Sequence, residues 1–213
     1  MSCVVIDVGT GNYRSVENGF RRMAAERGYA GAIARTADPE VIRGADRLVL
    51  PGVGAFGACA AGLFAAPGVA EAMRDAVFAR GRPLLGVCVG MQLLSDRGLE
   101  FGAHEGLGWI PGDVRPITPS GPEFKIPHMG WNVLRPRVPH PLFDGLAEGA
   151  HAYFVHSFTF HATQPEHVAA TVDHGGEITA AVIRDTVAGV QFHPEKSQAS
   201  GLRLIGNFLE WKP

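Results

Sequence analysis

The first hundred residues alternate short apolar runs with segments of helical periodicity. The apolar runs fall at residues 3–8, 32–37, 48–50 and 83–87, and each ends near glycine or proline. Between the first two runs, Val16, Phe20 and Met23 recur at helical spacing before Gly28, and residues 69–80 repeat apolar positions in the same way. Asp38 and Pro39 supply a cap and a first turn for a short helix between the second and third runs. Continuous apolar strands alternating with helices predict an α/β fold with a mostly parallel sheet covered on both faces.

The second half of the chain changes to short β-type runs separated by turns. These runs fall at residues 114–117, 131–134, 153–160, 168–172, 180–183 and 187–192, and residues 200–211 have the pattern of a final helix. There is no internal repeat, low-complexity segment or linker in the sequence. We therefore expect one domain over residues 1–213, with a small antiparallel extension of the parallel sheet.

Composition removes several function classes. Nineteen basic and 21 acidic residues give a net charge of −2, which argues against binding to nucleic acid or to anionic membranes. Residues 48–70 carry no charge over 23 positions, but two prolines and five glycines interrupt them, so we interpret them as strand, loop and helix rather than a membrane span. Three cysteines cannot form a disulfide framework, and the N-terminus lacks a basic region before an apolar run. A cytoplasmic location is the expectation.

The sequence Gly86-Val87-Cys88-Val89-Gly90 joins an apolar strand to a helix-like run over residues 90–94. It has the form of the G-x-nucleophile-x-G elbow, with cysteine as nucleophile. Glycines are needed there because side chains at the flanking positions would collide with neighbouring strands. The start of the following helix favours a thiolate, and the Val89 amide can face a developing oxyanion.

The competing interpretation of Cys88 is a core cysteine beside packing glycines. With 28 glycines and three cysteines in the chain, roughly 0.05 chance matches to this pattern are expected. The pattern by itself leaves the two interpretations open. Cys3, in an apolar strand, and Cys59, in an alanine-rich helix, are expected to be core residues, because an unreactive cysteine behaves as a small buried hydrophobe.

A histidine and a glutamate stand two residues apart after the last apolar run. In Gln191-Phe192-His193-Pro194-Glu195-Lys196, the period of a strand places His193 and Glu195 on the same side. The carboxylate can fix the imidazole tautomer, and the imidazole can then act as base and acid for a thiol. Five other histidines are most simply loop or strand-surface residues; they are His140, His151, His161, His167 and His174.

Two glycine-rich loops follow strands in the first half. Pro51-Gly52-Val53-Gly54 can direct backbone amides inward as donors, although the motif alone favours an ordinary strand-to-helix loop. Gly9-Thr10-Gly11-Asn12 lacks the spacing of a dinucleotide loop and the lysine of a phosphate-binding loop. No cysteine and histidine cluster has metal-ligand spacing, so neither a metal nor a cofactor is expected.

Seven segments together resemble the class I, triad-type glutamine amidotransferases. GVCVGMQLL (86–94) and QFHPEKS (191–197) are typical of the whole class. KIPHMGWN (125–132), YFVHS (153–157) and DVGTGNYRSV (7–16) are similar to its glutaminase subunits of imidazole glycerol phosphate synthase, and LPGVGAF (50–56) and GLGWIPG (106–112) also match. The resemblance covers most of the chain and implies a flavodoxin-like α/β fold.

The resemblance also implies roles for individual residues. Cys88 would attack glutamine, His193 would be the base and acid, and Glu195 would orient it. The family's oxyanion hole corresponds to the amides of Val53 and Val89. The positions that match its glutamine-binding residues are Gly54, Gln92, Glu100, Ser157 and Phe158. Family members often carry tyrosine at the last of these positions, so a side-chain hydrogen bond there is in doubt.

The resemblance further implies a partner. In the family, ammonia passes to the cyclase subunit HisF, a (β/α)₈ barrel that converts PRFAR to imidazole glycerol phosphate and AICAR in histidine biosynthesis. The positions that match the docking face are Asn12, Met129, Trp131 and Lys196. A core aromatic is the competing interpretation of Trp131. Two other function classes stay open from sequence: a stand-alone γ-glutamyl hydrolase with the same triad, and a non-catalytic docking subunit.

Overall fold

The computed structural model describes residues 1–9 and 12–213, so Thr10 and Gly11 of the first glycine loop lie outside the described residues. An eight-stranded sheet runs through the molecule in the order β2-β1-β3-β4-β14-β13-β12-β9. The first five strands are parallel, and the other three join antiparallel. Their bounds are β1 Ser2–Ile6, β2 Ala32–Thr36, β3 Arg47–Gly52, β4 Leu84–Cys88, β9 Arg135–Pro136, β12 Val168–Asp173, β13 Glu177–Arg184 and β14 Val187–Val190. This confirms the α/β class with a mostly parallel core, and the antiparallel part extends it on one side.

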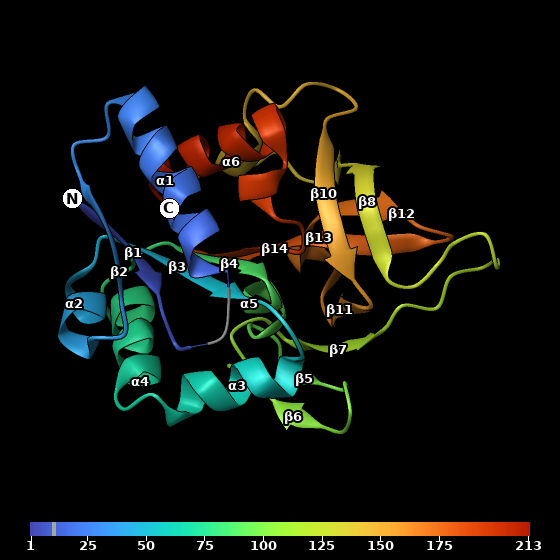
Figure 1. Cartoon of the computed structure of the whole chain (residues 1–213), viewed down its shortest axis with the longest axis horizontal. Helices are drawn as coiled ribbons and strands as arrows, with labels where there is room; N and C mark the ends of the chain where they lie inside the picture. Colours follow the sequence, from blue (N-terminus) through green and yellow to red (C-terminus); the bar gives the residue numbers. More distant parts are fainter. Residues whose placement is uncertain (10–11) are drawn as a thin grey trace.

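Helices cover both faces of the sheet (Figure 1). Helices α1 (Tyr13–Arg27) and α6 (Gln198–Glu210) lie on one face, and α2 (Pro39–Gly44), α3 (Phe56–Ala65) and α4 (Val69–Arg74) lie on the other. Local chemistry sets their ends as expected. The Asp38 carboxylate accepts from the Glu40 amide at 2.9 Å to start α2, and Gly28 ends α1 at a φ of 63°.

Two helical expectations need correction. The segment expected to open a helix at residues 90–94 forms only one turn, α5 (Val89–Gln92). The segment at 69–80 starts as α4 but continues as a wider π-helical turn, Asp75–Ala79. Within the described residues, no single helix is long and apolar enough to cross a membrane, and α3 would reach that length only together with Val69–Ala79 across a 92° bend.

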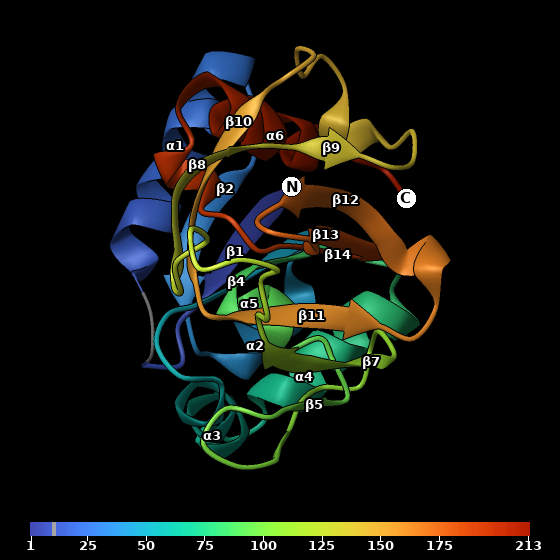
Figure 2. The same cartoon turned by 90° about the vertical axis from the view of Figure 1, so that its right-hand side faces the viewer.

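Two smaller sheets flank the main one. Strands β8 (His128–Val133) and β10 (His151–His156) form an antiparallel pair. Strands β11 (Phe158–Ala162), β7 (Gly112–Pro116), β5 (Arg97–Gly98) and β6 (His104–Glu105) form the other sheet, and Figure 2 shows β11, β7 and β5 on the same side of the main sheet as α3 and α4. The single strand expected at 153–160 is therefore wrong. The chain breaks at Ser157 because β10 pairs with β8 whereas β11 pairs with β7.

Candidate active site

The backbone turns sharply at Cys88, where β4 ends. Cys88 has φ 56° and ψ −114°, a conformation that side-chain-bearing residues rarely adopt and that marks strain at functional sites. A Cβ on Gly90 would lie 1.7 Å from the Leu50 carbonyl oxygen of β3, and a Cβ on Gly86 would lie 2.6 Å from the Gly90 oxygen. The elbow predicted from sequence is therefore present. Position 90 requires glycine because a neighbouring strand lies against it, as expected. Position 86 requires glycine because the backbone of the elbow itself folds back against it.

The other two cysteines have no such geometry. Cys3 and Cys59 are 0% and 1% exposed within the core, as expected. Burial raises the pKa of the Cys3 thiol to about 12, although the charge of Arg47 opposes this rise. A thiol held neutral in the core is unreactive, so Cys88 is the cysteine placed for chemistry.

His193 and Glu195 meet, but for a reason other than the one predicted. The strand ends at Val190, and residues Pro194–Lys196 form a 3-10 turn, so a strand period does not bring the two side chains together. The turn places His193 Nδ1 2.9 Å from Glu195 Oε1. The carboxylate accepts at that distance, so Nδ1 carries the hydrogen and Nε2 is left for Cys88.

The electrostatics of His193 depend on its two partners. Burial alone lowers the pKa of His193, but hydrogen bonds to Cys88 and Glu195, with the negative charges of both, raise the pKa to about 9. The Glu195 side chain is 1% exposed, and its Oε2 has no hydrogen-bond partner among the described residues. It lies beneath α1, where a Cβ on Gly19 would lie 3.2 Å from the Glu195 Cβ. An anion held this way stabilises an imidazolium next to a thiolate.

The backbone of His193 is fixed by the neighbouring strand β10. Its amide donates to the Tyr153 carbonyl at 3.0 Å. The Ser197 hydroxyl donates to the His193 carbonyl at 2.6 Å and accepts from the Tyr153 amide at 2.9 Å. These bonds connect the His193 turn to the YFVHS segment, so residues from two distant motifs hold one another in place.

A cavity of about 290 Å³ opens beside Cys88 and His193. Every residue predicted for the oxyanion hole or for substrate binding lines it, namely Val53, Gly54, Val89, Gln92, Glu100, Ser157 and Phe158. Three lining residues were missed from sequence: Pro127, Val155 and His156. Their signal was their place inside KIPHMGWN and YFVHS, two of the motifs that carry the family resemblance. The structure thus brings together the elbow, the histidine turn and the glycine loop.

The glycine loop differs in detail from the expectation. Strand β3 continues through Gly52, so only Val53 and Gly54 of the four residues form the loop. Gly54 has a φ of 106°, and the Val53 carbonyl accepts from the Cys59 thiol at 3.5 Å. Glu100 Oε2 accepts from the Phe56 amide at 2.8 Å, so this carboxylate also caps the first turn of α3. Glu100 therefore braces the segment that follows the loop.

A buried pair of histidines, also missed from sequence, adjoins the cavity. His128 Nδ1 lies 2.9 Å from His156 Nε2, across the β8–β10 pair. Burial, as the largest cause, lowers the pKa of His128 to about 3 and that of His156 to about 4. Both rings are therefore neutral at pH 7. His174, expected at the surface, packs its ring 4.2 Å from the His128 ring and is in fact part of this cluster.

Comparison with known proteins decides the family. The model of the class-I glutamine amidotransferase family matches residues 4–211. The chain belongs to the class-I glutamine amidotransferases. It is 54% identical to imidazole glycerol phosphate synthase subunit HisH of Mesorhizobium japonicum, over 100% of both chains. It is 56% identical to the subunit of the same name from Caulobacter vibrioides, over 98% of both chains.

A solved structure supports the fold independently. A crystal structure of a glutamine amidotransferase, 20% identical to this chain, superposes with a TM-score of 0.73 and covers 98% of this chain and 97% of that one. At that identity the likeness concerns the fold. The flavodoxin-like arrangement expected for an amidotransferase is confirmed.

The residues predicted for docking differ in exposure. In this amidotransferase Met129 is 66% and Trp131 48% exposed on β8, so Trp131 is not a core residue. The Trp131 ring packs edge-on against Tyr153 at 5.9 Å. Lys196 is exposed, and Asn12 is half-buried at the start of α1. The alternation of β8 puts Met129 and Trp131 outward while His128 and Asn132 form the inner cluster.

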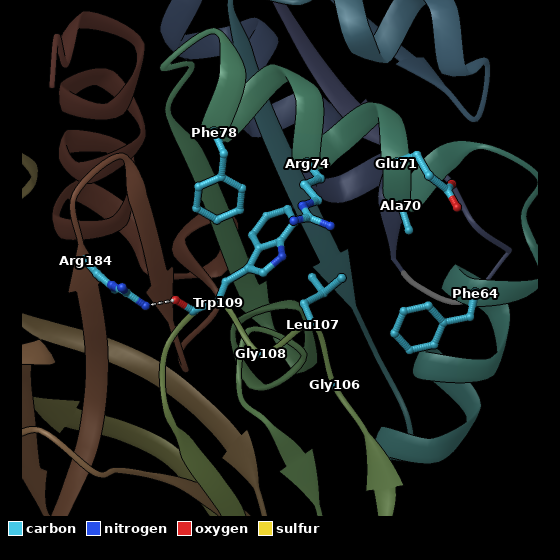
Figure 3. Close-up of a pocket in the computed structure, with 10 residues that line it drawn as sticks. All are labelled: Phe64, Ala70, Glu71, Arg74, Phe78, Gly106, Leu107, Gly108, Trp109 and Arg184. Atoms are coloured by element: carbon cyan, nitrogen blue, oxygen red, sulfur yellow. Dashed lines mark hydrogen bonds between the residues drawn. The ribbon is translucent and has the colours of Figure 1, made fainter.

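A second hollow of the amidotransferase lies away from the triad (Figure 3). It measures about 570 Å³, and Figure 3 shows the Trp109 and Phe78 rings side by side within it, packed edge to face at 5.1 Å. The Trp109 carbonyl accepts from Arg184 at 2.9 Å. The described residues that line it include no cysteine, serine or histidine, so it lacks the thiol or hydroxyl and the imidazole of a triad. Elsewhere in the described chain, no three His, Cys, Asp or Glu side chains are placed to hold a metal ion.

Proposed function

We propose that this chain, folded as a single domain over residues 1–213, is the glutaminase subunit of imidazole glycerol phosphate synthase in histidine biosynthesis. Its substrate is glutamine, which it hydrolyses to glutamate and ammonia. The observation that carries the proposal is one cavity in which a strained Cys88 meets the His193–Glu195 pair. The two HisH relatives above support the choice of pathway.

The reaction follows from the charge states of the triad. The Cys88 thiolate attacks the side-chain amide carbon of glutamine, and the carbon–nitrogen bond breaks as imidazolium His193 gives its proton to the leaving nitrogen. Ammonia and a γ-glutamyl thioester result. Neutral His193 then removes a proton from water, and the hydroxide attacks the thioester carbon. The carbon–sulfur bond breaks, releasing glutamate and restoring the thiolate and the imidazolium.

The cavity walls supply groups for each part of the substrate. Val53 and Val89 line the cavity with Cys88, and their amides are the proposed donors to the oxyanion of each tetrahedral intermediate. Glu100, half-buried, carries the negative charge suited to the substrate ammonium. Gly54 and Gln92, with the backbone of Ser157 and Phe158, complete the binding site.

The ammonia is useful only when it is kept from water, so the proposal includes a partner over the cavity mouth. This partner is the cyclase subunit HisF, a (β/α)₈ barrel. Asn12, Met129, Trp131 and Lys196 are the proposed docking residues, and the exposed apolar pair on β8 supports this choice. No cofactor, nucleic acid or membrane takes part.

The test is glutamate release from glutamine by the purified chain alone, with HisF, and with HisF plus its ribonucleotide substrate. We expect strong stimulation in the full mixture. Cys88→Ala should abolish glutamine-dependent synthesis and leave ammonia-dependent synthesis intact, because only the first needs the thiolate. Cys3→Ala, the same change at a buried core cysteine, is the matched control and should retain both activities. Full activity without the partner would favour a stand-alone hydrolase, and activity in Cys88→Ala would refute the nucleophile.

A further inference from the structure

A side chain outside the triad points at the nucleophile. Gln191, in the segment between β14 and His193, is 0% exposed. Its Nε2 lies 3.8 Å from Cys88 Sγ, within the range of an N–H donor to sulfur. Burying a polar amide is costly unless the amide is hydrogen-bonded. The contact between the buried Gln191 amide and the buried Cys88 sulfur therefore needs an explanation.

The orientation of the Gln191 amide is fixed by its neighbours. The Phe158 carbonyl oxygen is an acceptor only, and the Gln92 side-chain atom 3.3 Å from it must therefore be the nitrogen, Nε2. The same Gln92 Nε2 lies 2.9 Å from the other end of Gln191, which must accept and is therefore Oε1. It follows that Nε2 of Gln191, and not its oxygen, faces the sulfur.

The histidine pair holds the Phe158 carbonyl, where this series of hydrogen bonds ends. His156 Nδ1 lies 2.8 Å from the same Phe158 oxygen and must donate to it, so Nε2 of the neutral His156 ring accepts from His128 Nδ1. His128 Nε2 is then an acceptor, and Asn132 Nδ2 donates to it at 3.1 Å and to the Asp173 carbonyl at 2.8 Å. Each hydrogen bond in the series is therefore donated in the same direction, from Asn132 and His128 of β8 through His156 of β10 to the Phe158 carbonyl.

We propose that Gln191 is a fourth catalytic residue, whose side-chain N–H donates to the Cys88 thiolate and holds the sulfur toward the cavity. The inference rests on the proposed function, because it assigns a role at the same nucleophile. His193 and Gln191 then stabilise the anion as two separate donors, and Gln191 stays in place when His193 transfers its proton to the leaving nitrogen. A donor to an anion at a site that is 5% exposed acts with little competition from water.

The test is the alkylation of Cys88 by iodoacetamide across pH, followed by mass spectrometry of the Cys88 peptide in wild type and Gln191→Leu. Leucine removes the donor and approximates the volume. We expect the half-maximal pH to rise by about one unit, a tenfold loss of thiolate at a fixed pH below the midpoint. The two rates should converge on the alkaline plateau. A merely structural residue would lower the melting temperature without moving the midpoint. Gln164→Leu, the same change at an exposed glutamine, is the control.

A second measurement keeps the proposal testable when Gln191→Leu does not fold. The chain has four glutamines, so selective ¹⁵N labelling gives a simple side-chain amide spectrum. In wild type the Gln191 N–H signals should titrate with the Cys88 thiolate and change when Cys88 is alkylated. Unmoved signals, or superposed alkylation profiles, would overturn the role of Gln191 alone. Wild-type Cys88 that resists alkylation at all pH values would refute the nucleophile and the proposed function with it.

Discussion

His193 combines two opposing influences at the scale of a single residue. Burial lowers its pKa, whereas the bonds and charges of Cys88 and Glu195 raise it, with a net value of about 9. Because the folded pKa lies above the ordinary 6.5, the folded protein favours the imidazolium. The stabilisation is complete below about pH 6.5 and is lost as the pH rises through about 9. The same proton is the one that His193 gives to the leaving nitrogen.

The Glu195→Gln variant tests this balance. Glutamine keeps an acceptor for Nδ1 but removes the negative charge, so the pKa of His193 should fall. We expect the alkaline limb of the pH profile of kcat/KM, which lies near pH 9 in wild type, to move to lower pH. The activity below that limb should fall by roughly 10²-fold, the lower end of the range for one acid–base contribution. A profile of unchanged shape, scaled down at every pH, would mean that the Glu195 charge does not set the proton affinity of His193.

Close contact between two elements decides which residue can occupy position 90. Strand β3 passes over the elbow so tightly that a Cβ at this position would overlap the Leu50 carbonyl. We expect Gly90→Ala to lower the free energy of unfolding by about 3 kcal/mol or more, at the upper end of overpacking costs, because backbone must move. Gly44→Ala, at the end of α2 with open space around it, should change it by about 0.5 kcal/mol or less. Urea unfolding measures both, and equal values for the two variants would contradict the packing argument.

Local patterns predicted the elements better than the contacts between them. Apolar runs located the parallel strands because those runs are local in sequence. The glycine pattern located the elbow, but only Gly90 meets a neighbouring strand as expected, whereas Gly86 meets the Gly90 oxygen of the elbow itself. The strand at 153–160 was predicted as one because nothing local marks Ser157, whose carbonyl accepts from Ile117 forty residues away in sequence. Gln191 and His156 were missed for the same reason. They have side-chain partners in other elements, Gln92 of α5 for Gln191 and His128 of β8 for His156, and a buried amide or imidazole has no local signature.

The whole molecule places its chemistry where its sheets meet. Val53, Cys88 and His193 lie at or just after the carboxyl ends of β3, β4 and β14, the edge at which parallel sheets commonly hold their ligands. The smaller sheets add the remaining wall through Ser157, at the junction of β10 and β11. The sheet edge therefore supplies the reacting groups and the antiparallel additions close the cavity around them. The inward side of β8 supports that wall, and its outward side carries exposed apolar residues.

Trp131 tests whether the outward side of β8 is the docking surface. Trp131 is 48% exposed beside Met129, so a partner that binds there can bury a large apolar side chain. Tryptophan is also among the residue types that contribute most to binding energy at interfaces. We expect Trp131→Ala to weaken HisF binding by about thirtyfold, which is about 2 kcal/mol, measured by calorimetric titration. Val41→Ala, on α2 and 45% exposed, is the matched control and should bind as wild type does. Glutamine-dependent synthesis at low subunit concentration should fall with binding, whereas ammonia-dependent synthesis by HisF should not. Unchanged affinity in Trp131→Ala would contradict the assignment of the docking surface to β8, because the exposed aromatic residue of that strand would then contribute nothing to binding.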